Sequence, residues 1–515
     1  MGENLIHTLY DGRPPTSAAL HLPDNTIIST GELRNSVALL AAALHKLGVC
    51  PGDRVSFKLD KSVEVLFLAH ACLQLGAIIN PLNTSYTDPE LTYLVGDAEP
   101  KLLICLPDEE SRLHEIARTA GARVETLALG LQGTIGRLAR ASRPLQGISD
   151  VSGDTAAALL YTSGTTGKPK GACITHRNLA ESARTLAGVW KLGPWDRLLH
   201  ALPLYHAHGL LTAINALLVA GGSIVFLPRF EPVEVIKALP QCTVMMGVPT
   251  QYARLLKEPD LALAIKDTFR IAISGSAPLP AEVSERFQAV TGQRLIERYG
   301  LTETAIITAV PAEIEDRSGW VGWALPGVEI RAARDDRSCA DRDVVGVLET
   351  RGHNVFSGYW RRPEATAEAF TSDGWFITGD VAEIDRTGCV RLLGRSKDLI
   401  ISGGLNVYPK EVEDVLDSLT GGSKCAVFGV PHPDFGEAVV AVLELGSEAE
   451  FDEPGLLRAA RQQLAAYKVP KRILPVQAIP INKMGKVLKN ELRQAHRKLF
   501  ADGNEKFHPR KTEWI

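Results

Sequence analysis

A short segment in the first third of the chain has the residue types of a phosphate-binding loop. It reads Tyr161-Thr162-Ser163-Gly164-Thr165-Thr166-Gly167-Lys168-Pro169-Lys170-Gly171 and follows an apolar run, Ala156 to Leu160, that predicts a buried strand. Glycines let a backbone approach a phosphate closely, amide and hydroxyl groups donate to its oxygens, and lysines neutralise its charge. Pro169 directly follows Lys168, where a Walker A loop has Ser or Thr, so we expect a phosphate site of another kind. The alternative interpretation is a solvated polar loop.

This segment resembles the phosphate loop of the adenylate-forming superfamily, which includes acyl-CoA synthetases, firefly luciferase and the adenylation domains of peptide synthetases. Further stretches match the superfamily in order along nearly the whole chain, at Ser274 to Leu279, Arg298 to Thr304, Thr378 to Asp380, Gly394 to Asp398, Ser402 to Glu413 and Asn482 to Lys486. The resemblance implies an enzyme that uses ATP and Mg²⁺ to activate a carboxylic acid as an acyl-adenylate and then transfers the acyl group to coenzyme A. Adenylation is needed because a carboxylate oxygen leaves badly, whereas a phosphate leaves well when a thiol attacks.

The resemblance places the ATP site on residues from several parts of the chain. The β- and γ-phosphates are expected to be bound by Thr162, Ser163, Gly164, Thr165, Thr166, Gly167, Lys168 and Lys170. The rest of the nucleotide is expected to be bound by Gly275, Ser276, Ala277, Glu297, Tyr299, Gly300, Asp380 and Arg395. Within this set, Tyr299 is expected to stack on adenine and Asp380 to chelate the ribose hydroxyls. Taken alone, Asp380 is also typical of a turn.

The same resemblance assigns the catalytic groups. Thr302 is expected to contact the α-phosphate and Glu303, with Thr165, to bind Mg²⁺, since a lone loop carboxylate suits an ion that keeps most of its waters. Lys486 is expected to bridge the reacting carboxylate and the α-phosphate, where negative charge develops. The alternative is that Lys486 belongs to a solvated basic surface near the end of the chain. His206 is expected beside the acyl pocket.

Residues of the second half-reaction are implied in the same way. The superfamily rotates its C-terminal domain between adenylation and thioester formation, and Lys397 occupies the hinge position. The loop Ser402-Gly403-Gly404 is expected to line the thiol tunnel, because glycines permit close approach by a thin pantetheine arm. Lys468 and Arg472 are expected to meet the 3′-phosphate of coenzyme A.

The acid is indicated by Arg298, which directly precedes Tyr299. A cation beside an acyl pocket is costly unless it meets an anion, and an arginine binds a carboxylate in a bidentate manner. The local sequence resembles malonyl-CoA synthetases, which must recognise the second carboxylate of malonate, and Arg254 is similar to a second arginine of that group. Alternatively, Arg298 pairs internally with Glu297 or Glu313, and Arg254 is a helix-surface residue.

The chain also departs from the malonate pattern. Ala207 replaces the usual threonine between two histidines, and the pair Ala305-Ile306 lies where an Asn-Met pair is common after the Thr-Glu-Thr motif. Trp320 and Trp323 add bulk nearby. We therefore expect an acyl pocket, including Ser274, that accepts malonate or a 2-substituted malonate such as methylmalonate.

Composition and length are those of an ordinary globular protein with two or more domains. The chain has 515 residues, a net charge of −4 and 23% charged residues, which gives no electrostatic footprint for nucleic acid or an anionic membrane. Strand–helix alternation predicts α/β layers with parallel strands, followed by a small barrel-like region of short strands and a compact α+β domain. The expected boundaries are an N-terminal domain 1–394, a hinge 395–398, a mobile C-terminal domain 399–500 and a tail 501–515.

The chain has no recognisable signal peptide or membrane span, and its eight cysteines lack metal-ligand spacing, so we expect a cytoplasmic protein that is a monomer or a homodimer. Three other functions stay open. The first is a medium-chain or aryl acyl-CoA synthetase in which Arg298 points away from the acyl group. The second is an adenylating enzyme that loads a carrier protein, and the third is a non-catalytic nucleotide-binding protein.

Overall fold

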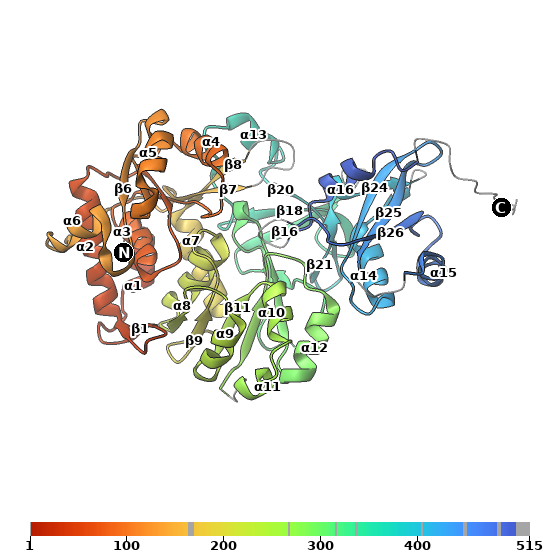
Figure 1. Ribbon diagram of the computed structural model, residues 1–515, viewed down its shortest axis with the longest axis horizontal. Helices are drawn as coiled ribbons and strands as arrows, with labels where there is room; N and C mark the ends of the chain where they lie inside the picture. Colours follow the sequence, from red (N-terminus) through yellow and green to blue (C-terminus); the bar gives the residue numbers. More distant parts are fainter. Residues whose placement is uncertain are drawn as a thin grey trace, which may run out of the picture. The chain divides into compact units, whose positions relative to one another are not determined.

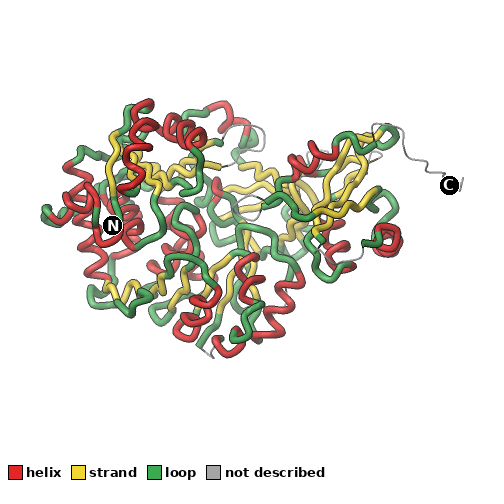
Figure 2. Tube along the Cα trace, in the orientation of Figure 1, coloured by secondary structure: helices red, strands yellow, loops and turns green. Residues whose placement is uncertain are grey.

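The chain folds into two compact units that are discontinuous in sequence. Unit 1 comprises Met1–Ile330 and Glu349–Thr378, and unit 2 comprises Arg331–Leu348 and the chain from Gly379 onward. The structure, a computed structural model, describes residues 2–162, 169–265, 268–314, 317–334, 338–402, 405–445, 451–481 and 486–500, apart from the side chain of Asn406. Figure 1 labels the elements, and Figure 2 shows how strand and helix alternate along the chain.

The larger sheet of unit 1 has a core of parallel strands. Its order is β15 (Trp323–Ala324), β14 (Thr308–Ala309), β13 (Leu295–Tyr299), β12 (Ile271–Ser274), β11 (Val244–Gly247), β9 (Arg197–His200), β10 (Ser223–Phe226), β1 (Ala18–His21) and β2 (Ile27–Ser29). Strands β1, β10, β9, β11, β12 and β13 pair in parallel, whereas β14 and β15 pair antiparallel at one edge. One face is packed by α9 (Pro232–Ala238), α10 (Pro249–Leu255), α11 (Leu261–Ala264) and α12 (Ala281–Thr291).

A second sheet of unit 1 carries the ends of the predicted phosphate segment. Its order is β19 (Gly358–Tyr359), β8 (Lys170–Thr175), β7 (Ala156–Thr162), β4 (Ile78–Pro81), β3 (Arg54–Lys58), β5 (Leu102–Cys105) and β6 (Arg123–Thr126). The other helices of unit 1 are α1 (Leu5–Tyr10), α2 (Thr30–Lys46), α3 (Val63–Gln74), α4 (Asp88–Ala98), α5 (Glu110–Thr119), α6 (Gly133–Arg140), α7 (His176–Val189), α8 (Ile214–Val219) and α13 (Pro363–Glu368). Strands β7 and β8 pair antiparallel up to Thr162 and Lys170, so both ends of the segment are held by one ladder.

The region of short strands forms the predicted small sheet. Its order is β17 (Cys339–Ala340), β16 (Val328–Ala333), β18 (Val344–Gly352), β20 (Phe376–Ile384) and β21 (Val390–Arg395). The boundary between the two units falls within β16 and β18 and within β20, so this sheet is not a separate unit. The pairing of β20 with β21 places Asp380 opposite Arg395.

The C-terminal part of unit 2 is built around strands that are apolar on both faces. Here β23 (Leu405–Val407), β22 (Ile400–Ser402), β25 (Gly436–Glu444) and β24 (Cys425–His432) follow in order, and β26 (Arg472–Val476) pairs in parallel with β25. Alternation along β25 sends Val439 and Ala441 to the core beneath α14 (Pro409–Leu419) and α15 (Glu453–Gln463). Val440 and Val442 face the opposite core, which includes Leu492 of α16 (Lys489–His496).

Within the described part of the chain, no helix combines the length and apolarity needed to cross a membrane.

Candidate active site

A buried arginine lies on β13, the third strand from one edge of the larger sheet of unit 1. Arg298 is on β13, and its residue surface is only 7% exposed. Its Nη2 donates to Ser276 Oγ at 3.5 Å, and its Nε has no hydrogen-bond partner among the described residues. Burial lowers the pKa of this guanidinium to about 10, which still leaves it charged near neutral pH.

The two carboxylates considered as internal partners of Arg298 contact other groups. Glu297 accepts from the backbone amide of Gly319 at 2.9 Å, and Glu313 pairs with Lys191. Neighbouring residues of a strand point to opposite faces, which also separates the side chains of Glu297 and Arg298. Within the described ranges, Arg298 has no carboxylate partner, and the alternative of an internal ion pair is not what the structure shows.

Two histidines lie close to this arginine, and one of them, His208, is on a widened helical turn. His208–Ala213 is a π-helix that leads into α8, and such turns are frequent at functional sites. His208 Nδ1 lies 3.1 Å from Ser276 Oγ, and its Nε2 has no partner in the part of the chain that the structure describes. Burial, together with the charge of Arg298, lowers the pKa of His206 to about 4 and holds the pKa of His208 well below its usual range. Both imidazoles are therefore neutral near pH 7.

His208 was not among the predicted site residues, yet it is the histidine that shares a hydrogen-bonding partner with Arg298. The His206-Ala207-His208 string was the only signal for it, and nothing in that string distinguishes the two imidazoles. Ala207, which lies between them, is partly exposed.

The loop after β12 is shaped to fit the arginine. Ser276, which bridges His208 and Arg298, has φ = +71°, a conformation that costs free energy for a residue with a Cβ and clusters at functional sites. A Cβ added at Gly275 would lie 2.4 Å from Arg298 Nε. The absence of a side chain at Gly275 therefore leaves the room that the guanidinium occupies.

Gly275→Ala is expected to displace Arg298, because overpacking a filled site costs about 1–3 kcal/mol. We expect a lower melting temperature and a reduced kcat/KM for the acid. Gly188→Ala is the matched control, since its added Cβ meets nothing within 4 Å on α7. Equal acid kinetics in the Gly275 variant and the wild type would contradict the proposed fit.

The predicted metal ligand is held by an aromatic side chain from β19. Glu303 lies in a 3₁₀ turn, Thr302–Thr304, and its Oε1 accepts from the hydroxyl of Tyr359 at 2.9 Å. The Nζ of Lys170 lies 5.1 Å from the centre of the Tyr359 ring. Tyr359 was not predicted as a site residue. The stretch Asn354 to Trp360 also resembles malonyl-CoA synthetases, and its place there was the only signal for Tyr359.

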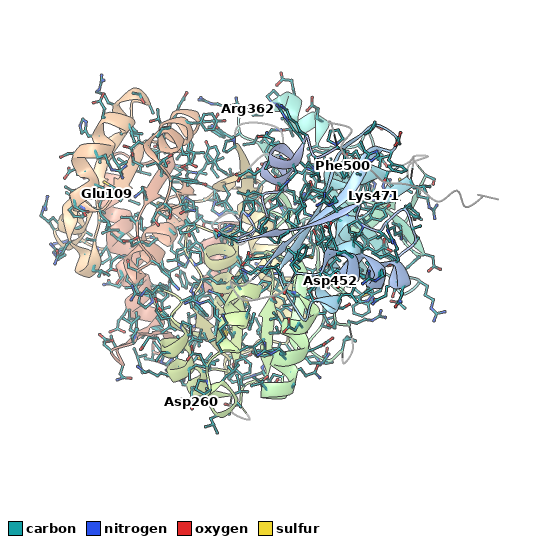
Figure 3. All side chains as sticks on the ribbon, turned by 45° about the vertical axis from the view of Figure 1, so that its right-hand side comes forward. Glu109, Asp260, Arg362, Asp452, Lys471 and Phe500 are labelled. Atoms are coloured by element: carbon teal, nitrogen blue, oxygen red, sulfur yellow. The ribbon has the colours of Figure 1, made fainter. Side chains whose placement is uncertain are left out.

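The helix α4 anchors both flanks of the predicted phosphate segment. Tyr161 donates to Asp97 Oδ2 at 2.9 Å, and Tyr93 donates to the carbonyl of Pro169 at 2.8 Å. Arg362, labelled in Figure 3, pairs with Asp97 Oδ1 at 2.7 Å. The central predicted residues, Ser163, Gly164, Thr165, Thr166, Gly167 and Lys168, lie outside the described residues, as do Gly403 and Gly404.

Unit 2 brings together the predicted ribose and hinge residues. Asp380 Oδ1 and Arg395 Nε pair at 2.8 Å, beside the left-handed Gly379. Lys397 lies in the adjoining 3₁₀ turn, Ser396–Asp398. Burial lowers the pKa of Lys397 to about 8, Asp398 opposes that effect, and the charges of Lys486, Arg395 and Arg493 add to it. Lys486 itself is exposed.

The cations predicted to meet coenzyme A already have carboxylate partners. Lys468 pairs with Glu411 at 2.5 Å, and Arg472 Nε pairs with Glu453 at 2.9 Å. Each would have to share or exchange its partner to bind a phosphate. Ser402 is buried in β22.

The remaining predicted residues fall into two groups. Arg254 is exposed at the end of α10 with its guanidinium 5.0 Å from the centre of the Phe230 ring, and no described contact joins it to Arg298. The others lie near the loops that follow β12 and β13: Ser274, Tyr299 and Ile306 are buried, and Ala277, Gly300 and Thr302 are partly exposed.

Comparison with known proteins gives matches along most of the chain. Residues 11–360 match the family described as AMP-binding enzyme, and residues 411–486 match the AMP-binding enzyme C-terminal domain. A feruloyl-CoA synthase of Amycolatopsis sp is 35% identical over 485 residues, covering 93% of this chain and 96% of the relative. A malonate–CoA ligase of Arabidopsis thaliana is 34% identical over 484 residues, covering 87% of this chain and 79% of the relative. The crystal structure of ATP-bound MatB from Rhodopseudomonas palustris is 43% identical, with a TM-score of 0.94 over 97% of this chain and 100% of that one.

Proposed function

The chain belongs to the AMP-binding enzyme family, and from that premise we propose that it converts malonate or a 2-substituted malonate, such as methylmalonate, into its CoA thioester. Family membership confirms the predicted superfamily, the α/β fold and the reaction class: the protein is a CoA ligase that works through an acyl-adenylate and uses ATP, Mg²⁺ and coenzyme A. The identity of the acid is the proposal.

One observation carries the choice of acid. Arg298 is buried and charged, and no carboxylate among the described residues pairs with it. A buried cation without a partner is unfavourable, so an anionic group of the substrate is its natural complement. The second carboxylate of a malonate fits this requirement, because it can accept from a guanidinium in a bidentate manner. A malonate–CoA ligase among the relatives supports the same choice.

Neutral histidines complete the polar side of the proposed acyl pocket. His208 offers an Nε2 that has no partner in the described structure, and it shares Ser276 with Arg298. Ala207 and Ile306 are expected to leave room for a substituent at C2 of the acid. Because the imidazoles stay neutral, Arg298 supplies the positive charge of this group of residues.

The remaining residues have roles in adenylation. Glu303 fits magnesium as a single carboxylate ligand: no cluster of three or more His, Cys, Asp or Glu is found in the described ranges, and Mg²⁺ commonly binds through one or two carboxylates, water and phosphate oxygens. Bound magnesium would neutralise charge on the phosphates. Tyr299 is proposed to stack on adenine, Asp380 with Arg395 to bind the ribose, and Thr302 to bind the α-phosphate.

Lys486 is proposed to serve adenylation, and Lys397 to serve the rotation that follows. Lys486 places a positive charge between the attacking carboxylate oxygen and the α-phosphate as the new bond forms and pyrophosphate leaves. The sulfur of coenzyme A then attacks the acyl carbon, and AMP leaves. Lys468 and Arg472 stay candidates for the 3′-phosphate of coenzyme A, in competition with Glu411 and Glu453.

A panel of acids tests the proposed function. With ATP, Mg²⁺ and coenzyme A, we expect thioester formation from malonate and methylmalonate, weaker turnover of ethylmalonate, and little from succinate, butyrate or benzoate. Selective turnover of butyrate or benzoate would overturn the choice of acid while keeping the reaction class. Turnover of malonate with no methylmalonate product above background would restrict the pocket to unsubstituted malonate.

A monocarboxylate is the second candidate substrate, because the feruloyl-CoA synthase relative is as similar to this chain as the malonate–CoA ligase. In that case Arg298 would contact the nucleotide or the protein instead of the acyl group. Transfer to a carrier protein in place of coenzyme A is tested by supplying each thiol separately.

A further inference from the structure

We propose that Tyr359 is a positioning residue for Glu303, and that through this carboxylate it sets the affinity for magnesium-bound ATP. The inference rests on the proposed role of Glu303 as a magnesium ligand. It adds a residue that does not itself touch the ion.

Two hydrogen bonds tie Glu303 to the segment that carries Tyr359. The Tyr359 hydroxyl donates to Glu303 Oε1 at 2.9 Å, and the backbone amide of Phe356 donates to the carbonyl of Glu303 at 2.8 Å. One bond fixes the backbone of the 3₁₀ turn and the other fixes the rotation of the carboxylate. No described residue donates to Oε2, so this oxygen remains for a cation.

The Tyr359 side chain is itself held firmly. Its ring meets the ring of Phe356 edge-on, with centroids 4.9 Å apart, and Phe356 packs against Phe370 and Phe376. Tyr359 pairs with Ala172 of β8 in the sheet. A positioning residue must be more rigid than the group it positions, and this aromatic cluster satisfies that condition.

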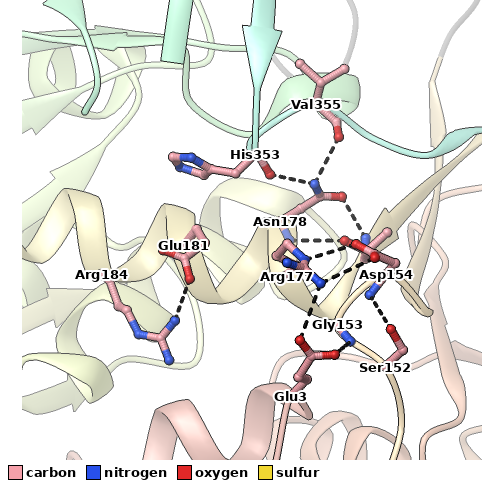
Figure 4. A network of polar contacts seen from close by, with 11 residues as sticks. Glu3, Ser152, Gly153, Asp154, Arg177, Asn178, Glu181, Arg184, His353 and Val355 are labelled. Atoms are coloured by element: carbon pink, nitrogen blue, oxygen red, sulfur yellow. Dashed lines mark hydrogen bonds and ion pairs between the residues drawn. The ribbon is translucent and has the colours of Figure 1, made fainter. Parts of the chain in front are cut away.

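The start of the same segment is anchored to α7. The Nδ2 of Asn178 donates to the carbonyls of His353 and Val355 at 2.6 and 2.9 Å, and Figure 4 shows both bonds. Asn178 also completes the capping box of α7: its backbone amide donates to Oγ1 of the N-cap residue Thr175 at 3.1 Å, and its Oδ1 accepts from the backbone amide of Thr175 at 2.8 Å. The chain from His353 to Tyr359 is thus fixed at its first residues by α7 and at its last residue by β8.

The Tyr359 side chain contacts two charged residues of the predicted phosphate site, Glu303 and Lys170. Its hydroxyl faces the carboxylate of Glu303, and the Lys170 ammonium lies over its face. In a hydrogen bond between a phenol and a carboxylate, the phenol O–H is the donor and the carboxylate oxygen the acceptor.

A carboxylate that is held in one orientation binds magnesium more tightly than a carboxylate that rotates freely. Mg²⁺ requires nearly ideal octahedral geometry, so a ligand that must first be oriented binds it less tightly. Partners that orient metal ligands typically contribute about 10- to 100-fold in metal affinity. The Tyr359 hydroxyl is in the position of such a partner.

The test is calorimetric binding of ATP to Tyr359→Phe without any acid, once with Mg²⁺ and once with EDTA. The variant keeps the aromatic packing and the Lys170 contact and loses only the hydroxyl. We expect the affinity for ATP with Mg²⁺ to fall about 10- to 100-fold and the affinity in EDTA to change by less than about threefold. Tyr93→Phe is the matched control, because it removes a hydroxyl bond to Pro169 and should weaken both affinities alike.

A double substitution distinguishes a failure of this inference from a failure of the proposal that Glu303 binds magnesium. The magnesium effect is the ratio of the ATP affinity with Mg²⁺ to the ATP affinity in EDTA. If Tyr359 acts through Glu303, adding Tyr359→Phe to Glu303→Gln lowers this ratio no further. The inference would be overturned if the losses from the two substitutions were additive. It would also be overturned if Tyr359→Phe left the magnesium effect unchanged, or weakened ATP binding equally with and without Mg²⁺. A normal magnesium effect in Glu303→Gln would instead overturn the proposed metal ligand itself.

Discussion

Arg298→Met is expected to remove most of the activity with malonate while activity with butyrate is kept or raised. A site built to bind a polar group discriminates against a substrate that lacks it by about 10⁴-fold, and that preference depends on the guanidinium. Methionine has a similar length and no charge, so the buried site remains filled. The measurement is kcat/KM for malonate, methylmalonate and butyrate at saturating ATP and coenzyme A.

Two further substitutions sharpen this result. Arg298→Lys keeps a charge and loses the planar fork, so we expect an intermediate loss for malonate. Arg286→Met is the control, because Arg286 is an exposed residue on α12 whose described partner is Glu282. If Arg298→Met leaves the ratio of malonate to butyrate activity unchanged, the acid is not recognised through this residue.

Lys486→Ala is expected to slow adenylation by about 10²- to 10³-fold, the usual cost of losing one donor aimed at developing negative charge. Thioester formation from chemically prepared acyl-adenylate should persist, because that step does not need a charge between carboxylate and α-phosphate. Pyrophosphate release measures the first half-reaction, and thioester formation from the supplied acyl-adenylate measures the second.

The control for this experiment is another lysine of the same region. Lys489 Nζ pairs with Glu413 at 2.6 Å and is half-buried, so Lys489→Ala should lower the melting temperature and affect both half-reactions alike. The same pattern in Lys486→Ala would show that this residue, too, is needed for folding rather than for adenylation.

Elements with a strong local pattern were predictable from the sequence. The apolar run Ala156 to Leu160, predicted as a buried strand, forms the body of β7. The alternation of strands and helices predicted parallel strands, and β9 to β13 pair in parallel within the larger sheet of unit 1. In each case the signal lies within a few neighbouring residues.

Contacts between distant segments were not predictable from the same patterns. Nothing near Lys468 or Arg472 indicates Glu411 or Glu453 as a partner, because each pairing depends on how helix α14 or α15 packs. The same holds for Tyr359, which meets Glu303 from a different sheet. Arg298 was predicted from its place directly before Tyr299 and from the resemblance to malonyl-CoA synthetases, whereas its proximity to Ser276 and His208 depends on loop geometry.

The π-helix His208–Ala213 makes the arrangement of the histidines sensitive to chain length. A π turn accommodates one more residue than an α turn, so deleting a single residue there would restore regular α-helix running into α8. Each residue of an α-helix turns by about 100°, so His208 would rotate away from Ser276 by roughly that angle. Gain or loss of one codon could therefore change the acid that such an enzyme accepts in a single step, where a series of substitutions would otherwise be needed.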